Sequence, residues 1–296
     1  MAETFTNGKA HMNIVYLDTS FLSQLAKAEM RPRSMPNAQP WSKLIDELRR
    51  HVNQGSAMCP ASEFQVDEAL LLEDPEIIRK INTIQHELSN GYCFRYWWEI
   101  VVRQTGALVH KYMGVLPGAQ HNWSAVVRRI LVSASPHDTR AAKEKVRQFL
   151  DRLQEAMPLG RSYLEQRELE KQDLVHQLFQ APDNLCFRML LRECNIPAHR
   201  FPPQFFDSKL IDEIPYVDIF SSIRASLAVH EPTRKTKGSD LFDAAALASV
   251  LPYCDVVTTD KNVQAHIIDR IHYDSKYAAQ ILAPTKAGVE ALLKML

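Results

Sequence analysis

The chain has 296 residues, and its 35 Lys and Arg residues balance 35 Asp and Glu residues, so its formal net charge is zero. Hydrophobic residues make up 46% and charged residues 24%, which is ordinary for a globular protein of one large domain or two smaller ones. The charge balance excludes a protein that coats nucleic acid through an overall positive charge, although a local basic surface remains compatible with it.

The cysteines and the first residues give no sign of export. Five Cys residues occur without a C-x-x-C spacing, which argues against a disulfide framework and against a zinc knuckle. Residues 1–11 lack an apolar stretch, so we expect no signal peptide and treat residues 1–12 as a flexible leader. No apolar run reaches about 18 residues, so we expect no membrane span, and a cytoplasmic protein with reduced thiols.

The first predicted element is a short buried strand at residues 13–18, which ends in Asp18. Thr19 and Ser20 follow it and open a segment with helical spacing, which any of these three side chains can cap. The next elements predicted by apolar periodicity are a helix, a short strand and a second helix, at 41–54, 56–60 and 62–74. A β-α start of this kind favours an α/β sheet, in which sites gather at the carboxyl ends of the strands.

The middle of the chain, at about 76–230, has mostly helical spacing and few strand signals. The predicted helices are at 77–88, 96–112, 123–132, 139–157 and 161–179. An aromatic run also lies here, formed by Tyr92, Phe94, Tyr96, Trp97 and Trp98. Such a run fits a base-stacking surface, but the core of a helical layer is the favoured interpretation.

The end of the chain returns to α/β character. A basic segment with Arg234, Lys235 and Lys237 precedes a helix that begins at Ser239, which is a suitable N-cap. A second buried strand, at 255–260, ends in Thr and Asp as the first strand does. A last strand and a last helix are expected at 281–282 and 285–295. The two ends of the chain thus look like halves of one sheet, with a helical segment inserted between them.

Acidic residues gather where the predicted elements meet. Asp18 and Asp260 end two strands, and Asp240 and Asp243 lie on one face of the helix between them. Glu68 lies on the early helix, where its spacing brings it to the border of the core, whereas its neighbours Glu63 and Asp67 are expected to face solvent. Acids at one sheet edge repel one another unless a cation lies among them. Hard oxygen ligands favour Mg²⁺ or Mn²⁺, and such a site suits phosphodiester hydrolysis.

Four motifs in this order resemble those of the PIN-domain nucleases. They are IVYLDTS at 14–20, PASEFQVDEAL at 60–70, SDLFDAAALAS at 239–249 and VVTTDKN at 256–262. The resemblance implies an α/β fold, a PIN-like parallel-sheet sandwich with helices on both faces. This core would comprise residues 13–75 plus 235–296, and a mostly α-helical insertion would occupy residues 76–234.

The resemblance also assigns the site. It implies the catalytic carboxylates Asp18, Glu68, Asp240, Asp243 and Asp260. Of these, we expect Asp18, Glu68, Asp240 and Asp260 to bind Mg²⁺ or Mn²⁺. The third acid stays open, because Asp240 lies 20 residues before Asp260 and Asp243 lies 17 before it. Thr19 and Ser20 are expected to support the site, and Thr258 matches the threonine that orients the last acid. The basic residues Arg234, Lys235 and Lys237 are expected to contact the substrate backbone.

The implied function is that of a metal-dependent endoribonuclease, with RNA favoured over DNA as the partner. Two alternatives stay open, a DNA or flap-type nuclease and a catalytically silent PIN-like binding or regulatory module. A haloacid-dehalogenase-type phosphatase is disfavoured, because that site needs a second Asp where this chain has Ser20. The insertion could clamp the substrate, or form the interface with a second copy or a protein partner.

Overall fold

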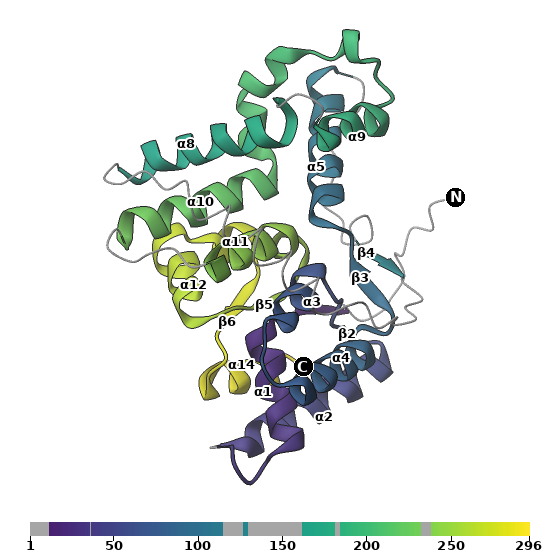
Figure 1. The fold of residues 1–296 in the computed structure, drawn as a ribbon, viewed down its shortest axis with the longest axis vertical. Coiled ribbons are helices and arrows are strands. Elements are labelled where there is room, and N and C mark those ends of the chain that lie inside the picture. Colours follow the sequence, from purple (N-terminus) through teal and green to yellow (C-terminus); the bar gives the residue numbers. More distant parts are fainter. Residues whose placement is uncertain (1–11, 36, 115–126, 130–161, 181–183, 232–237) are drawn as a thin grey trace.

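The computed structural model describes residues 12–35, 37–114, 127–129, 162–180, 184–231 and 238–296, which form a mostly helical chain around a small sheet (Figure 1). The sheet contains β2 (Ala57–Met58), β1 (Asn13–Tyr16), β5 (Val256–Thr258) and β6 (Gln280–Leu282), in that spatial order. All three strand pairs are parallel. The predicted α/β class is therefore confirmed at the level of a small parallel sheet in a mostly helical chain.

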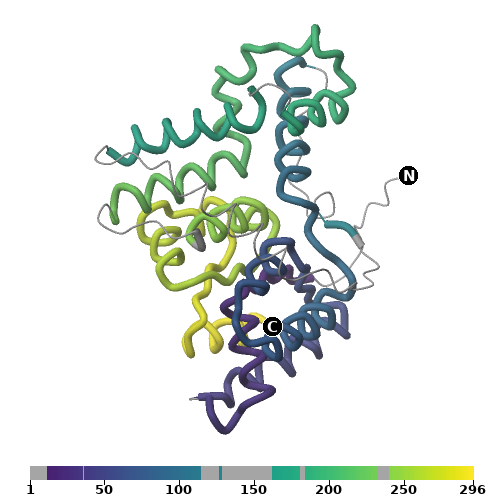
Figure 2. Tube along the Cα trace, viewed as in Figure 1, coloured from purple at the N-terminus to yellow at the C-terminus, as the bar shows by residue number. Residues whose placement is uncertain are grey.

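The helices precede, separate and follow these strands. They are α1 (Thr19–Met30), α2 (Ala38–Gln54), α3 (Glu63–Leu70), α4 (Pro75–Ser89), α5 (Trp97–Tyr112), α8 (Tyr163–Val175), α9 (Leu185–Cys194), α10 (Pro215–His230), α11 (Gly238–Val250), α12 (Lys261–Ala265), α13 (Tyr273–Tyr277) and α14 (Lys286–Met295). The N-terminal segment, in purple, and the C-terminal segment, in yellow, share the lower part of the molecule (Figure 2). Strands β1 and β5 join these two segments directly.

Side chains that alternate along the strands divide the interior into two hydrophobic cores. Along β1, Ile14 and Tyr16 contribute to one core, and Val15 contributes to the other. In β5, Val257 and Val256 divide in the same way, as the two-residue period of a strand requires. Helices α1, α2, α4 and α14 supply the core on the Val15 face, and α5, α10, α11 and the segment after β5 supply the other. Helices thus cover both faces of the sheet.

The direction in which successive strands are added to the sheet reverses between β1 and β5. From β1 the chain crosses to β2 on one side, and from β5 it crosses to β6 on the other side. In an open parallel sheet, such a reversal leaves a crevice outside the carboxyl ends of the two central strands. The strand ends of this crevice are followed by Asp18 and Asp260.

Helix α10 is the buried centre of the additional helical layer. Most of its residues are buried, and it packs between α8 and α11 (Figure 1). Its buried Asp218 accepts hydrogen bonds from Arg167 of α8 and Lys276 of α13, at 2.7 and 2.6 Å. A buried carboxylate with two cationic partners holds these helices at fixed positions. Residues of the predicted insertion therefore share one hydrophobic core with the sheet.

The helix predicted over 123–132 is wrong in the part that the structure describes. Residues Val127–Arg129 form strand β4, which pairs antiparallel with β3 (Tyr92–Phe94). The apolar residues of this stretch fit a strand as well as a helix, and pairing with β3 decides between them. The predicted helix at 139–157 and residues 1–11 of the predicted leader lie outside the described residues, whereas Met12 packs against the core.

None of the described helices is both long enough and apolar enough to cross a bilayer.

Gly288 lies where helix α14 packs closely against the backbone that follows strand β6. A Cβ atom at this position would lie 2.1 Å from the carbonyl oxygen of Ala283, and a backbone atom cannot rotate away. We expect Gly288→Ala to lower the free energy of unfolding by about 2 kcal/mol, in the range of overpacked cores. Chemical denaturation measures this, and Ala287→Ser at the exposed neighbour is the control, with a change below about 0.5 kcal/mol. Equal stability of both variants would contradict the close packing.

Candidate metal site

Asp18 is held at the carboxyl end of β1 by hydrogen bonds to both of its oxygens. It is the N-cap of α1, and its Oδ1 accepts from the backbone N–H of Phe21 at 3.0 Å. The hydroxyl of Ser20 donates to Oδ2 at 2.6 Å. The side chain is only 7% exposed, so these bonds fix its orientation. Capping and ligand binding are compatible here, because a carboxylate oxygen can accept more than one contact.

Thr258 connects the two central strand ends. Its hydroxyl accepts from the backbone N–H of Asp18 at 2.8 Å and donates to the Asp18 carboxylate at 2.9 Å. The family resemblance implied that this threonine orients Asp260, and the structure corrects that role. Thr258 is the last residue of β5 and lies next to β1 in the sheet, so its hydroxyl points at the neighbouring strand end.

Glu68 reaches the site from α3, and a capping box fixes that helix. The Ser62 hydroxyl accepts from the backbone N–H of Gln65, and the Gln65 side chain accepts from the backbone N–H of Ser62 at 2.7 Å. Gln65 also donates to the carbonyl oxygen of Leu17, one residue before Asp18. The hydroxyl of Thr19 donates to the backbone carbonyl oxygen of Gln65 in the same helix at 3.5 Å. Gln65 therefore ties the helix that carries Glu68 to the strand end that carries Asp18.

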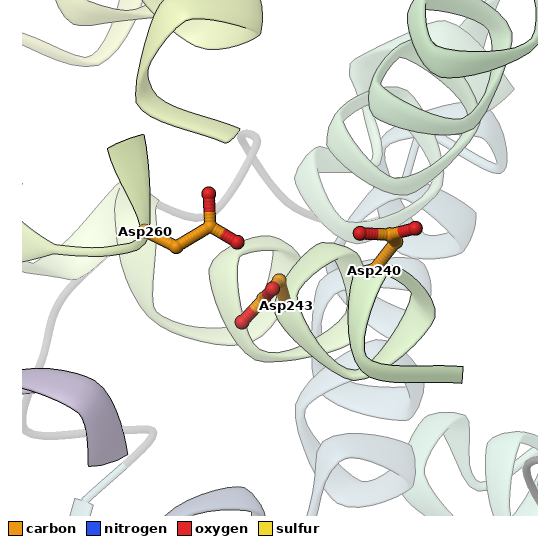
Figure 3. Close-up of side chains that lie close together, drawn as sticks. All are labelled: Asp240, Asp243 and Asp260. Carbon is orange, nitrogen blue, oxygen red and sulfur yellow. The ribbon is translucent and has the colours of Figure 1, made fainter. Parts of the chain in front are cut away.

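Three further carboxylates come from the C-terminal segment. Asp240 and Asp243 lie on successive turns of α11, and Asp260 approaches them from the end of β5 (Figure 3). One carboxylate oxygen from each residue lies within 4.8 Å of the others, so the three could hold a metal ion. Asp260 is also the N-cap of α12, where it accepts from the N–H of Val263 at 2.8 Å.

A small pocket gathers carboxylates from both ends of the chain. Among the residues that line it are Asp18, Glu68 and Asp243, with the aromatic rings of Tyr16 and Phe64 beside them. The cavity volume is about 10 Å³, the space of about one water molecule or ion. Neither Asp240 nor Asp260 lines this pocket, although both belong to the acidic triad with Asp243. Asp243 is thus the residue of α11 that joins the two groups of acids.

Burial and mutual repulsion raise the pKa values of Asp18, Glu68 and Asp243. Burial raises the pKa of Glu68 to about 7, and the charges of Asp18 and Asp260 add to the effect. Burial also raises the pKa of Asp243 well above its usual value, with further contributions from Glu68 and Asp260. Burial raises the pKa of Asp18 as well, although its hydrogen bonds oppose the change. A cation would relieve this cost, because it favours the charged form of each carboxylate.

The expected substrate-binding residues lie outside the described residues, and one expectation about burial on α3 was wrong. Arg234, Lys235 and Lys237 lie outside the described residues. Glu63 and Asp67 were expected to face solvent, but both are half-buried. Glu63 accepts from the backbone N–H of Trp97 at 2.7 Å. Burial raises the pKa of Glu63 to about 7. Helical spacing alone does not reveal that β3 and the start of α5 cover the side chain of Glu63.

Two residues at the site were missed in the sequence. Gln65 had a readable signal, since Ser62 and Gln65 form the S-x-x-Q pattern of a capping box. Tyr16 had none, because its position in a buried strand predicts only a core residue. Its hydroxyl lies 3.2 Å from the Ser62 hydroxyl, and its ring lines the pocket.

No protein-family model, no curated protein and no solved structure matches this chain. The assignment of the site therefore depends on the motifs of the chain and on the geometry of its acids.

The raised pKa of Glu68 predicts how stability depends on pH without metal. Between its ordinary value of 4.5 and about 7, the folded state binds more protons than the unfolded state, so stability falls as pH rises through this window. The expected loss at Glu68 is on the order of 2–3 kcal/mol. Thermal unfolding in EDTA at pH 5 and pH 8 should give a lower Tm at pH 8. The part of this decrease that Glu68→Gln removes measures the contribution of Glu68, because the pKa of Glu63 is raised into the same window.

Mg²⁺ should recover the lost stability at pH 8. We expect this recovery in the wild type and in the control Glu63→Gln, because Glu63 does not line the pocket. Glu68→Gln should lose most of it. A Tm that rises with pH, or equal recovery in both variants, would contradict the assignment.

Proposed function

We propose that this chain is a PIN-like metal-dependent nuclease that hydrolyses phosphodiester bonds, with RNA as its substrate and Mg²⁺ or Mn²⁺ as its cofactor. One observation carries the proposal. Acids from four elements converge at the carboxyl ends of β1 and β5, namely Asp18, Glu68, Asp243 and Asp260. Their order along the chain is the order of the four PIN-like motifs.

The donor set fits a hard divalent cation. Among the described residues, the candidate metal cluster contains Asp residues alone, without His or Cys, so it offers carboxylate oxygens as ligands. Such ligands select Mg²⁺ or Mn²⁺ over zinc. When bound, the ion would activate a water molecule and offset the negative charge that develops on the phosphate.

The chain's own residues would position this chemistry. Asp18, Glu68, Asp243 and Asp260 would hold the ion, with Asp240 as a further ligand or as a partner that acts through water. Ser20 and Thr258 keep Asp18 in one orientation through hydrogen bonds of 2.6 and 2.9 Å. Phe64 and Phe242 border the same pocket and limit the access of bulk water.

RNA is proposed as the substrate on the strength of the family resemblance. Arg234, Lys235 and Lys237 lie just before Asp240 in the chain, and we assign them to the phosphate backbone of the substrate. All five cysteines are free, which agrees with the proposed cytoplasmic location.

Variants of α11 test both the activity and the choice of the third acid. Purified protein with Mn²⁺ should cut a labelled RNA, and Asp18→Asn or Asp243→Asn should slow cleavage by about 100-fold or more. Asp240→Asn should cost only about tenfold, as expected for a residue that acts on the ion through water. Single-turnover cleavage rates measure these effects, and Asp46→Asn on the exposed face of α2 is the control with an unchanged rate.

Several outcomes would count against the proposal. Full activity of Asp18→Asn would show that cleavage does not depend on the clustered carboxylates. Cleavage of DNA but not RNA would replace the substrate and keep the site. Absence of both Mn²⁺ binding and cleavage would favour the catalytically silent module.

A further inference from the structure

The aromatic run at residues 92–98 divides into a buried part and a surface part. Phe94 is 3% exposed and packs edge-on against Tyr16. Trp97 stacks on Tyr216 of α10, with centroids 5.7 Å apart. Tyr96 instead is 41% exposed, and its ring stacks on Trp98 at 5.9 Å and an interplanar angle of 12°. The expectation that this run forms core thus holds for Phe94, and for Tyr92, Trp97 and Trp98, which pack against the core, but not for Tyr96.

Arg128 completes a stack of planar groups at this surface. Its guanidinium carbon lies 4.3 Å from the centroid of Tyr96, within the range of a cation–π contact. Antiparallel pairing of β4 with β3 brings it there, and Glu99 accepts from its Nη1 at 3.4 Å. We call Tyr96, Trp98 and Arg128 the Tyr96 platform. Because both strand pairing and an ion pair hold Arg128, the platform is preorganised.

Helix α3 connects the Tyr96 platform to the acidic pocket. Glu63, at the start of this eight-residue helix, accepts from the N–H of Trp97, which lies between the two stacked rings in sequence. Glu68, one and a half turns later, lines the pocket. Val66 between them is 46% exposed. A single-stranded chain that crosses α3 could therefore contact both places.

Charge around the platform argues for a base as its ligand rather than a phosphate. Glu99 already binds both Arg95 and Arg128, at 3.2 and 3.4 Å. Glu63, itself close to Asp67, adds a further acidic group beside Arg128 and Glu99. A phosphate would meet no excess of positive charge among these residues, whereas the neutral face of a base would stack without that penalty.

We infer that the Tyr96 platform binds an unpaired nucleobase of the nucleic acid that the acidic pocket would cut. This inference rests on the proposed function and adds a requirement to it, since the bases of a duplex are not free to stack. Stacking depends on the π-face and not on hydrogen bonds to base edges, so the platform would select single strands with little base preference.

Binding of a short fluorescent oligouridylate tests the inference in EDTA, where metal-dependent cleavage is stopped. Tyr96→Ala should weaken binding about tenfold, the effect of one lost base stack, and Tyr96→Phe should stay within about twofold. An abasic oligomer of the same length should bind weakly and equally to all variants. Tyr112→Ala is the matched control, because Tyr112 lies at the other end of α5 and is 40% exposed. Circular dichroism checks folding, and Tyr96→Leu replaces Tyr96→Ala if the latter unfolds.

The results separate this inference from the proposed function. Unchanged affinity of Tyr96→Ala, or an equal loss with the abasic oligomer, would overturn the platform. Wild-type protein that binds an aromatic peptide but no oligonucleotide would overturn it as well. Mn²⁺ titration of the same Tyr96 variants reports on the acidic pocket, and normal Mn²⁺ affinity there would leave the metal site standing when the platform fails.

Discussion

Carboxylates that share a buried pocket repel one another. The arrangement of residues around the pocket depends on the hydrogen bonds, and on the cation, that can offset this repulsion. Desolvation and like charges raise the pKa values of Glu68 and Asp243, so the charged forms of these two carboxylates are destabilised in the absence of a cation. Asp18 is better satisfied, since three hydrogen bonds support its charged form. The pocket therefore combines one carboxylate whose charge is supported by hydrogen bonds with two whose charged forms are destabilised, and a divalent ion would relieve this imbalance.

The fold concentrates these acids because the direction in which strands are added to the sheet reverses between the two central strands. Parallel pairing of β1 and β5 brings Asp18 and Asp260, which are far apart in sequence, to the same edge. Thr258 holds the two strand ends together through the Asp18 backbone and side chain. Helices α3 and α11 then deliver Glu68 and Asp243 from opposite ends of the chain. Each acid thus depends on a different element, and loss of any one element would disperse the pocket.

The positions of the clustered acids could be predicted from the sequence where the local pattern of a strand or helix also determines the tertiary position. Strands that end in an acid predicted Asp18 and Asp260 at one edge, because parallel strands must align their carboxyl ends. The spacing of Asp240 and Asp243 left the third acid open, since one helix face presents both, and only the packing of α11 brings Asp243 to the pocket wall.

Other features depend on contacts that no local pattern encodes. The hydroxyl of Thr258 turns to a neighbouring strand, and β4 exists because β3 pairs with it. The aromatic run behaved as two sets, since Trp97 finds Tyr216 on a distant helix and Tyr96 finds Arg128 on a paired strand. Burial of Glu63 has the same cause, which is cover from a segment remote in sequence.

A crystal of the protein soaked with Mn²⁺ and measured at the manganese absorption edge tests the central claim most directly. We predict an anomalous peak at the carboxyl ends of β1 and β5, about 2.0–2.6 Å from oxygens of Asp18, Asp243 and at least one of Glu68 and Asp260. A peak bound only by Asp240 and surface groups, or no peak at this edge at saturating Mn²⁺, would contradict the account.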